Sequence, residues 1–355
     1  MRSRIIAVTL PLTLVLATIA LFLPTGFVVR SPGPTQDTLG ARRVGASEIA
    51  MVEINGATSF PTSGELRLTT VSVGGGPIGP IMPMDALVGW AVPSRSVVPV
   101  ETVFRQGETR QEQQERSAAQ MVTSQEAATA AALTELGFDI PTTLTIVGTS
   151  VDSNAIGVVE GGDIAKELNG IPITNQSQLL GLLTDIAPES TVVLTVEREG
   201  ELVDLPLVTG RATNDDGSER AALGVFLGTD FEFPIDVAIQ IENIGGPSAG
   251  LMFALAIIDR LTEVDELQGV SVSGTGTINI AGEVGPIGGV VQKMHGALRD
   301  GSNWFLTPTF NCPEVIGAIP RGMNVVAVST LSEARVAIEA IGAGITDALP
   351  SCEAA

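Results

Sequence analysis

The sequence has few of the side chains that most active sites use. Its 355 residues include no tyrosine, a single histidine (His295) and only two lysines, Lys166 and Lys293. Zinc sites need three or four His, Cys or acidic ligands at close spacing, and neither HExxH nor CxxC occurs, so we expect no metal site. The phosphate-binding motif GxxxxGK[ST] is absent as well. The chain is therefore not itself a P-loop ATPase, and we expect it to need no cofactor.

Basic residues are scarce relative to acidic ones. Forty Asp and Glu face nineteen Lys and Arg, which gives a net charge of −21. Proteins that bind nucleic acid need basic patches, so we expect no nucleic-acid partner. The length is sufficient for two or three domains, each with its own core.

The N-terminus contains the longest uncharged stretch, Ile5 to Val29. A span of about 20 apolar residues is enough for a membrane helix. A cleaved signal peptide would have a shorter apolar core and a small-residue cleavage site, and no such site is evident. We therefore expect an uncleaved single-pass anchor over residues 1–30. Arg2 and Arg4 precede the span and Arg30 follows it, so the positive-inside rule does not fix the orientation.

Cysteine is almost absent, with only Cys312 and Cys352. In an oxidising exterior the two could pair, whereas two unlinked thiols fit the sequence equally well. With the anchor, the possible disulfide favours a cell-membrane protein whose larger part lies outside the cytoplasm.

The rest of the chain predicts an α+β protein in three parts. Residues 31–136 read as a β-rich region followed by a helical arm, with Thr123 and Glu126 as a possible capping box inside the arm. A polar, charged linker, RATNDDGSER, separates a middle unit at 137–212 from a C-terminal unit at 220–345.

The middle unit has a recognisable order of short strands, turns, a helix and a final hairpin. Its segments Gly161-Gly162-Asp163-Ile164 and Leu168-Asn169-Gly170-Ile171-Pro172-Ile173 resemble those of a PDZ domain. The resemblance implies a module that binds an extended peptide at a sheet edge, with the terminal carboxylate near residues 137–140. An unrelated small β domain is the alternative.

The C-terminal unit contains NIGGPSAG followed by the apolar LMFALAII. Pro247 suits the first turn of a helix, which would put Ser248 at the positive helix end beside unpaired backbone N–H groups. Such groups can bind an oxyanion, and glycines let a substrate backbone approach closely. Gly245, Gly246, Pro247 and Ala249 are thus candidate oxyanion or substrate-binding residues. A small-residue helix start buried in a core is the alternative.

A serine nucleophile needs a base, and the sequence offers few. Lys293 and His295 lie on one predicted helix, Val290 to Asp300. At about 100° per residue they point about 200° apart, so only one can face Ser248. Lys293 lies at the margin of the apolar face, where lost solvation lowers the pKa of an amine. A lysine that extends to the solvent is the alternative.

The motif around Ser248, together with GTGTINIAGEVGPIGGVVQKMHGALRDG, resembles the proteolytic domain of the Lon family of serine proteases over about residues 225–342. The resemblance implies a Ser–Lys dyad: Ser248 as nucleophile, Lys293 as general base, and Thr275 as the hydroxyl that orients the lysine amine. ATP-dependent Lon proteases have an acidic residue two positions before the proline, where this sequence has Gly245. The ATPase module is also missing, and the anchor with a PDZ-like unit is similar to the bacterial membrane-anchored PDZ-Lon proteases.

These features predict an ATP-independent, membrane-anchored serine endopeptidase that hydrolyses protein or peptide substrates, with the PDZ-like unit selecting or gating them. Two alternatives stay open: a non-enzymatic PDZ adaptor with a Lon-like fold, and a cytoplasm-facing protease fed by a separate ATPase. The resemblance also implies self-association, in rings of six.

Overall fold

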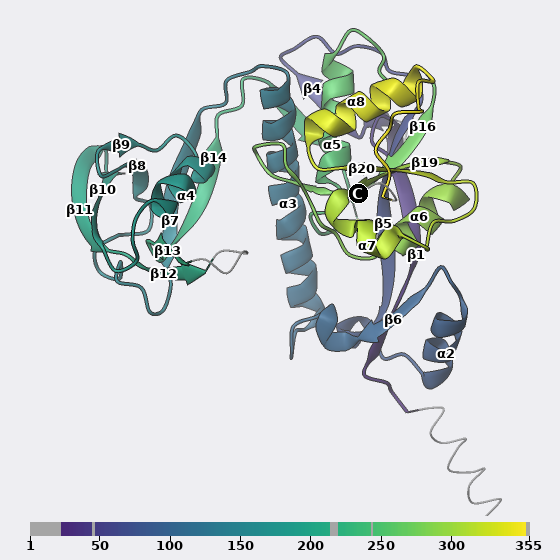
Figure 1. Cartoon of the computed structure of the whole chain (residues 1–355), viewed down its shortest axis with the longest axis horizontal. Helices are drawn as coiled ribbons and strands as arrows, with labels where there is room; N and C mark the ends of the chain where they lie inside the picture. Colours follow the sequence, from purple (N-terminus) through teal and green to yellow (C-terminus); the bar gives the residue numbers. More distant parts are fainter. Residues whose placement is uncertain (1–22, 45–46, 214–218, 243, 353–355) are drawn as a thin grey trace, which may run out of the picture. The chain divides into compact units, whose positions relative to one another are not determined.

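The computed structural model describes residues 23–44, 47–213, 219–242 and 244–352. These residues form two compact units: Asp139–Pro234 is one, and the chain before and after that insertion is the other (Figure 1). The division differs from the expected one, because residues 31–136 do not form a region separate from the C-terminal unit. Their strands lie inside the same sheet as the C-terminal strands.

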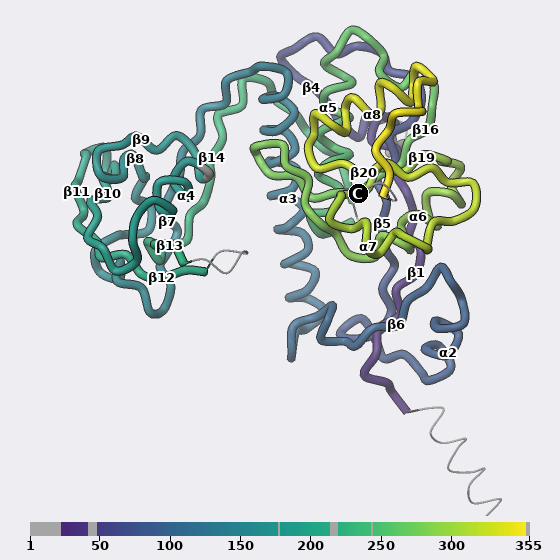
Figure 2. The backbone as a smooth tube through the Cα atoms, in the orientation of Figure 1, coloured from purple at the N-terminus to yellow at the C-terminus, as the bar shows by residue number. Residues whose placement is uncertain are grey.

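The first unit is built on a six-stranded sheet with the order β20-β19-β16-β5-β1-β6. In that order the strands are Asn324–Val328, Trp304–Pro308, Ser271–Gly274, Glu65–Gly75, Phe27–Asp37 and Ser96–Pro99. The four strands from β20 to β5 are mutually parallel, and β1 pairs antiparallel with both β5 and β6. Figure 2 traces how the purple N-terminal strands run beside the green and yellow C-terminal ones.

Helix α5 is the centre of the first unit. It spans Gly250–Leu261, and all residues from Gly250 to Asp259 are buried. A helix that is apolar all round can be stable only when other elements cover every side. Here β5, α3 and α8 (Leu331–Gly342) pack against it, and the fully buried Leu66 and Leu68 of β5 belong to the same core.

The predicted helical arm is α3, Arg110–Glu135. Its N-cap is Thr109, whose side chain accepts from the Glu112 N–H in a capping box. The proposed box at Thr123 and Glu126 is wrong, because both residues lie in the helix interior, where backbone N–H groups already have partners. The predicted stop at Gly137 fits the structure: Gly137 has φ +85°, as glycines after helix ends often do.

Further short elements complete the first unit. They are β2 (Ala41–Val44), β3 (Ser47–Ala50), β4 (Val52–Asn55), η1 (Gly76–Ile78), α2 (Pro83–Ala91), η2 (Val100–Thr102), β15 (Asp236–Ile239), β17 (Thr277–Ile278), β18 (Val284–Gly285), α6 (Val290–Arg299), η3 (Thr309–Asn311) and α7 (Cys312–Val315). Cys312 and Cys352 form a disulfide with a Cα–Cα distance of 5.0 Å, so of the two possibilities left open the structure has the paired one.

The second unit contains the sheet β11-β10-β8-β7-β14. Its elements are β7 (Thr142–Thr149), β8 (Ile164–Leu168), β9 (Ile171–Pro172), α4 (Gln176–Thr184), β10 (Thr191–Arg198), β11 (Glu201–Val208), β12 (Gly210–Thr213), β13 (Glu219–Ala222) and β14 (Val225–Phe231). The expected boundaries at 212 and 220 are wrong. The ends of the predicted linker pair as β12 and β13, and β14 pairs with β7, so both belong to this unit.

The expected anchor falls largely outside the described residues, which begin at Leu23. Its predicted end is wrong, because Phe27 to Arg30 pair with β6 as the start of β1. Among the helices in the described part of the chain, none has both the length and the apolar character needed to span a membrane.

Candidate active site

Ser248 lies in a turn between the glycine pair and α5. The helix begins at Gly250 with Ala249 as N-cap, so the prediction that Pro247 occupies the first helical turn is wrong. The Gly250 N–H instead donates to the Pro247 carbonyl at 3.4 Å, which closes a turn before the helix. Gly246 has φ +89°, a conformation that favours glycine.

Lys293 reaches the site from α6. Gly289, at φ 72°, is the N-cap of this helix, and a Cβ there would lie 2.8 Å from Val71 Cγ2 of β5. Glycine therefore lets α6 begin close against the sheet. Lys293 is 3% exposed, which is deeper than the helix margin that the sequence indicated. Burial disfavours the charged amine and lowers the pKa of Lys293 to about 7.

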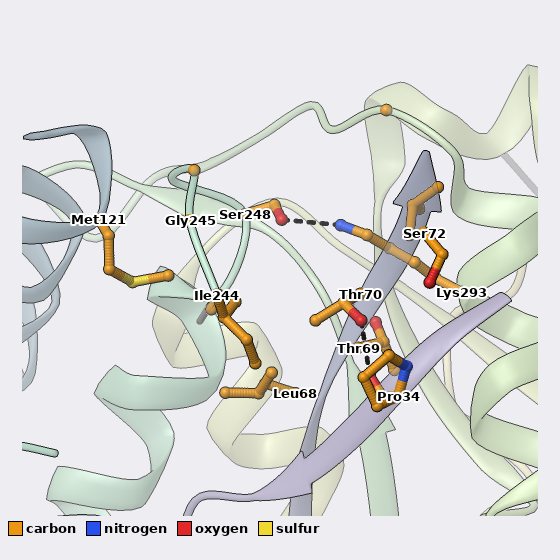
Figure 3. Close-up of a pocket in the computed structure, with 14 residues that line it drawn as sticks. Pro34, Leu68, Thr69, Thr70, Ser72, Met121, Ile244, Gly245, Ser248 and Lys293 are labelled. Atoms are coloured by element: carbon orange, nitrogen blue, oxygen red, sulfur yellow. Dashed lines mark hydrogen bonds between the residues drawn. The ribbon is translucent and has the colours of Figure 1, made fainter. Parts of the chain in front are cut away.

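The amine of Lys293 lies within hydrogen-bonding distance of both other predicted catalytic side chains. Lys293 Nζ is 2.8 Å from Ser248 Oγ (Figure 3), and it donates to Thr275 Oγ1 at 2.8 Å. The Thr275 hydroxyl in turn donates to the Ser248 carbonyl at 3.0 Å. The Gly276 N–H donates to the same carbonyl at 3.0 Å. Thr275 therefore bonds both the amine and the backbone of the serine, and it is fully buried.

His295, the other base considered, takes no part. It is half-buried on α6, and Ser248 Oγ faces Lys293 instead. Within the described parts of the chain, no group of three or more His, Cys, Asp or Glu side chains is arranged to hold a metal ion.

A cavity of about 310 Å³ opens beside Ser248 and Lys293. Part of its wall comes from residues that the sequence did not single out: Pro34, Leu68, Thr69, Thr70, Val71, Ser72 and Met121. Figure 3 shows several of these side chains around the Ser248–Lys293 pair. Strand β16 ends at Gly274, opposite Leu68, whereas β5 continues to Gly75. Among the described residues, the β5 edge beyond Leu68 has no strand beside it on the side where β16 lies.

Helix α3 holds the serine loop from the other side. The Ser117 carbonyl accepts the Gly246 N–H at 2.9 Å, and the Ser124 hydroxyl donates to the Pro247 carbonyl at 2.9 Å. A Cβ at residue 245 would lie 2.6 Å from Ser117 Cβ. A side chain at position 245, such as the acid of the ATP-dependent Lon proteases, would therefore collide with α3. The Ala-rich sequence of α3 gave no signal for this contact.

The predicted oxyanion residues divide into two groups. Gly245, Gly246 and Ala249 line the cavity, whereas Pro247 does not and has no N–H to donate. The Gly246 N–H is already bonded to Ser117. In the described part of the chain the N–H groups of Ser248 and Ala249 have no backbone acceptor, so both are available to an oxyanion. Gly246 and Pro247 have no free N–H to offer, and their role in substrate binding stays a prediction.

The second unit has a groove of its own, about 420 Å³ in volume. It lies between α4 and the start of β14, and its apolar lining includes Leu179, Leu183, Val225 and Leu227. The expected carboxylate position at residues 137–140 does not line it. The groove lies instead beside Gly224, whose carbonyl accepts the Ser150 N–H at 2.9 Å.

Comparison with known proteins identifies the part of the chain that holds Ser248 and Lys293. Residues 239–339, which include Ser248, Thr275 and Lys293, match the family model of the Lon protease (S16) C-terminal proteolytic domain. The chain carries a Lon-type proteolytic domain. The prediction of a serine peptidase domain is thereby confirmed.

Two relatives show how far the Lon-type likeness extends. The Lon protease of Helicobacter pylori is 27% identical over 198 residues, covering 51% of this chain and 23% of the relative. The Lon protease of Roseiflexus castenholzii is 31% identical over 180 residues, covering 47% and 20%. The chain thus spans about a fifth to a quarter of the length of these Lon relatives. The PDZ domain of the SdrC-like protein from Listeria innocua matches 24% of this chain and 92% of its own, with 14% identity and a TM-score of 0.22.

Proposed function

We propose that the chain is an ATP-independent serine endopeptidase that hydrolyses peptide bonds of protein substrates with Ser248 and Lys293. One observation carries the proposal: a buried lysine amine lies 2.8 Å from the Oγ of a serine that lines an open cavity. A lysine whose pKa is about 7 is half neutral at neutral pH. Its lone pair can then accept the proton of the serine hydroxyl.

The reaction follows from this geometry. Lys293 Nζ accepts the Ser248 hydroxyl proton as Oγ forms a bond to the substrate carbonyl carbon. The tetrahedral intermediate collapses, the C–N bond breaks, and the lysine ammonium gives its proton to the leaving amine. Water, deprotonated by the same amine, then hydrolyses the acyl-enzyme and frees Ser248. Thr275 keeps the Lys293 amine directed at Ser248 Oγ throughout the reaction, because the threonine hydroxyl accepts a hydrogen bond from the amine.

The oxyanion would be held by the N–H groups of Ser248 and Ala249, neither of which has a backbone acceptor in the described part of the chain. Preorganised donors of this kind contribute strongly in acyl transfer. The unpaired edge of β5 from Thr69 to Ser72 lines the same cavity and can receive an extended peptide as an added strand. This edge orients the scissile bond over Ser248.

The second unit supplies substrate selection in this proposal. Strand β14 is the outer strand of its sheet, and the apolar groove runs beside it. That combination suits an extended peptide that adds to β14 and puts an apolar side chain between Leu179 and Leu183, as the PDZ resemblance implies.

The uncharged residues 5–22 would anchor the protein in the cell membrane, with the catalytic part outside the cytoplasm. The Cys312–Cys352 disulfide supports an oxidising compartment. Assembly into rings remains a prediction, which the molecular mass of the detergent-solubilised chain would test.

The experiment compares the full chain with Lys293→Met and Ser248→Ala in detergent, with unfolded casein and no ATP. We expect cleavage by the parent alone. The full chain is preferable to a version starting at residue 31, because that cut removes the first residues of β1. Cleavage that persists in Ser248→Ala would overturn the catalytic assignment.

A substrate-independent measurement separates a selective peptidase from an adaptor without activity. A peptide boronic acid forms a tetrahedral adduct with an activated serine, and boron NMR reports that adduct directly. We expect it in the parent and not in Ser248→Ala. If the parent neither cleaves casein nor forms the adduct, the peptidase proposal fails and the adaptor alternative is favoured.

A further inference from the structure

Helix α2 exposes its large apolar side chains and buries its small ones, the reverse of an ordinary surface helix. At about 100° per residue, Met84, Leu87 and Val88 fall on one face, and these side chains are 53%, 51% and 41% exposed. The buried residues of α2 are Ala86 and Gly89, which fall on the opposite face. Small side chains thus contact the sheet while large apolar ones face outward, an arrangement that packing against the fold does not explain.

The close approach on the inner face requires the small residues. A Cβ at Gly89 would lie 2.6 Å from Val97 Cγ2 of β6 and 3.5 Å from Val29 of β1. The helix is therefore held tightly against the sheet edge in this orientation. Trp90, 59% exposed, lies at the border between the two faces and meets Phe27 edge to face at a ring distance of 5.9 Å.

We call the exposed apolar side chains of α2 and of the chain next to its start the α2 surface. It consists of Leu23, Phe27, Met82, Met84, Leu87, Val88 and Trp90, all exposed. Residues 74–94 contain only one ionisable side chain, Asp85, and its carboxylate accepts the Met82 N–H at the start of the helix. The chain as a whole is strongly acidic, with a net charge of −21.

The chain enters the fold beside this surface. Thr25 donates from both its N–H and its hydroxyl to the Ile81 carbonyl, at 3.0 and 3.1 Å, and Ile81 lies two residues before the start of α2. The described part of the chain therefore begins, at Leu23, close to the start of α2. In Figure 1, α2 and the start of β1 lie at the end of the first unit opposite α8.

We propose that the α2 surface docks into the interfacial layer of the lipid bilayer that holds residues 5–22. Apolar side chains gain free energy on leaving water, and tryptophan prefers the membrane interface. An anionic bilayer repels the acidic remainder of the protein, so the uncharged α2 end is the one that can approach it. The docking fixes the orientation of the Lon-type domain relative to the membrane. It goes beyond the proposed peptidase activity and depends only on the anchoring of residues 5–22.

The chain has two tryptophans, Trp90 and Trp304, so Trp304→Phe leaves Trp90 as the only fluorescent indole. The full-length variant would be reconstituted into vesicles of phosphatidylcholine and phosphatidylglycerol whose acyl chains carry bromine near the headgroup. We expect Trp90 emission to move to shorter wavelength and to be quenched by the brominated lipid. The matched control carries Val336→Trp on α8 in a Trp90→Phe, Trp304→Phe background, because Val336 is 61% exposed. Its emission should stay unquenched.

Flotation of the vesicles separates the anchoring of residues 5–22 from the docking of the α2 surface. A chain that does not float with them overturns both the anchor and the docking. A chain that floats with Trp90 emission solvent-like overturns the docking alone. A shift of Trp90 emission to shorter wavelength without quenching would mean that a second protein copy, and not lipid, covers the α2 surface. This result also overturns the docking. Replacing Met84 and Leu87 by Gln, both exposed, should remove the quenching while leaving the unfolding temperature unchanged, and quenching that persists contradicts the proposal.

Discussion

The two ends of helix α5 both hold buried ionisable groups, but they differ in what surrounds those groups. Before the N-terminal end, Lys293 has a pKa lowered to about 7 by burial. At the C-terminal end, burial raises the pKa of Asp259 to about 6 and that of Glu266 to about 7. Both ends thus hold groups that titrate near neutral pH.

Only at the N-terminal end of α5 does the ionisable group lie beside a side chain with which it could react. Lys293 lies beside a serine hydroxyl and a cavity. Glu266 instead accepts from Arg335 Nε at 2.8 Å, and Asp259 accepts from the Glu266 N–H at 3.2 Å. Neither carboxylate lines the cavity at Ser248. A strongly shifted pKa therefore indicates a reactive group only when access and geometry accompany it.

The largest expected difference between the two ends is in activity. Ser248→Ala and Lys293→Met should each lower kcat/KM by about a thousand-fold or more, as loss of a nucleophile or its base does. Asp259→Asn, an equally buried change at the other end, should alter it only a few-fold. Peptidase assays on the three full-length variants measure this. An equal loss of activity in all three variants would show that the two ends of α5 do not differ in function.

The next largest effect is on pH dependence. Only neutral Lys293 can act as the base, and its pKa is about 7. We therefore expect kcat/KM to fall about tenfold per pH unit below that value, reaching about 100-fold at pH 5. A flat profile between pH 5 and pH 8 would exclude Lys293 as the base.

Stability should respond to pH with opposite signs at the two ends. The folded chain holds protons on Asp259 and Glu266 that the unfolded chain releases from about pH 4 upward, so their contribution to the free energy of unfolding falls as pH rises to about 7. For Lys293 the unfolded chain binds the extra proton, so stability rises between about pH 7 and the ordinary lysine pKa of 10.5. Urea unfolding of Glu266→Gln and Lys293→Met against the parent measures each window. Lys293→Met should be more stable than the parent at neutral pH.

Thr275 distinguishes orientation of the amine from burial alone. Thr275→Val removes the acceptor for Lys293 Nζ, and we expect activity to fall about 10- to 100-fold because the amine is no longer aimed. A hydrogen bond to the ammonium favours the charged form, so losing it should move the acid limb of the pH profile to lower pH. Thr275→Ser should restore both. Loss of activity with an unmoved profile would indicate a structural role only.

The smallest expected effect is at α3. Ser124→Ala removes the bond to the Pro247 carbonyl, a net contribution of about 0.5–1.5 kcal/mol, and we expect kcat to fall about 2- to 10-fold. Thr123→Ala on the same helix is the matched control, because the Thr123 hydroxyl donates to the Ala119 carbonyl within α3. Equal effects of the two changes would show that α3 does not position the serine loop.

Much of the site was accessible from the sequence because its motifs are local. GGPSAG followed by an apolar run predicted a serine before a buried helix, and the short helix after Gly289 predicted the lysine. The depth of Lys293 was not predicted, because the wall that buries it includes β5, more than 200 residues earlier in the chain. The contact of α3 with Gly245 and Gly246 was missed for the same reason.

The sequence by itself determined the local chemistry: which serine, which lysine, and the helices and turns that carry them, since each depends on neighbouring residues. Tertiary structure decided the partners. Alternation in β5 marks a strand but does not say that it pairs with β16 on one side and β1 on the other. Pairing depends on contacts between distant segments, and folding selects them by the apolar surface that they bury together.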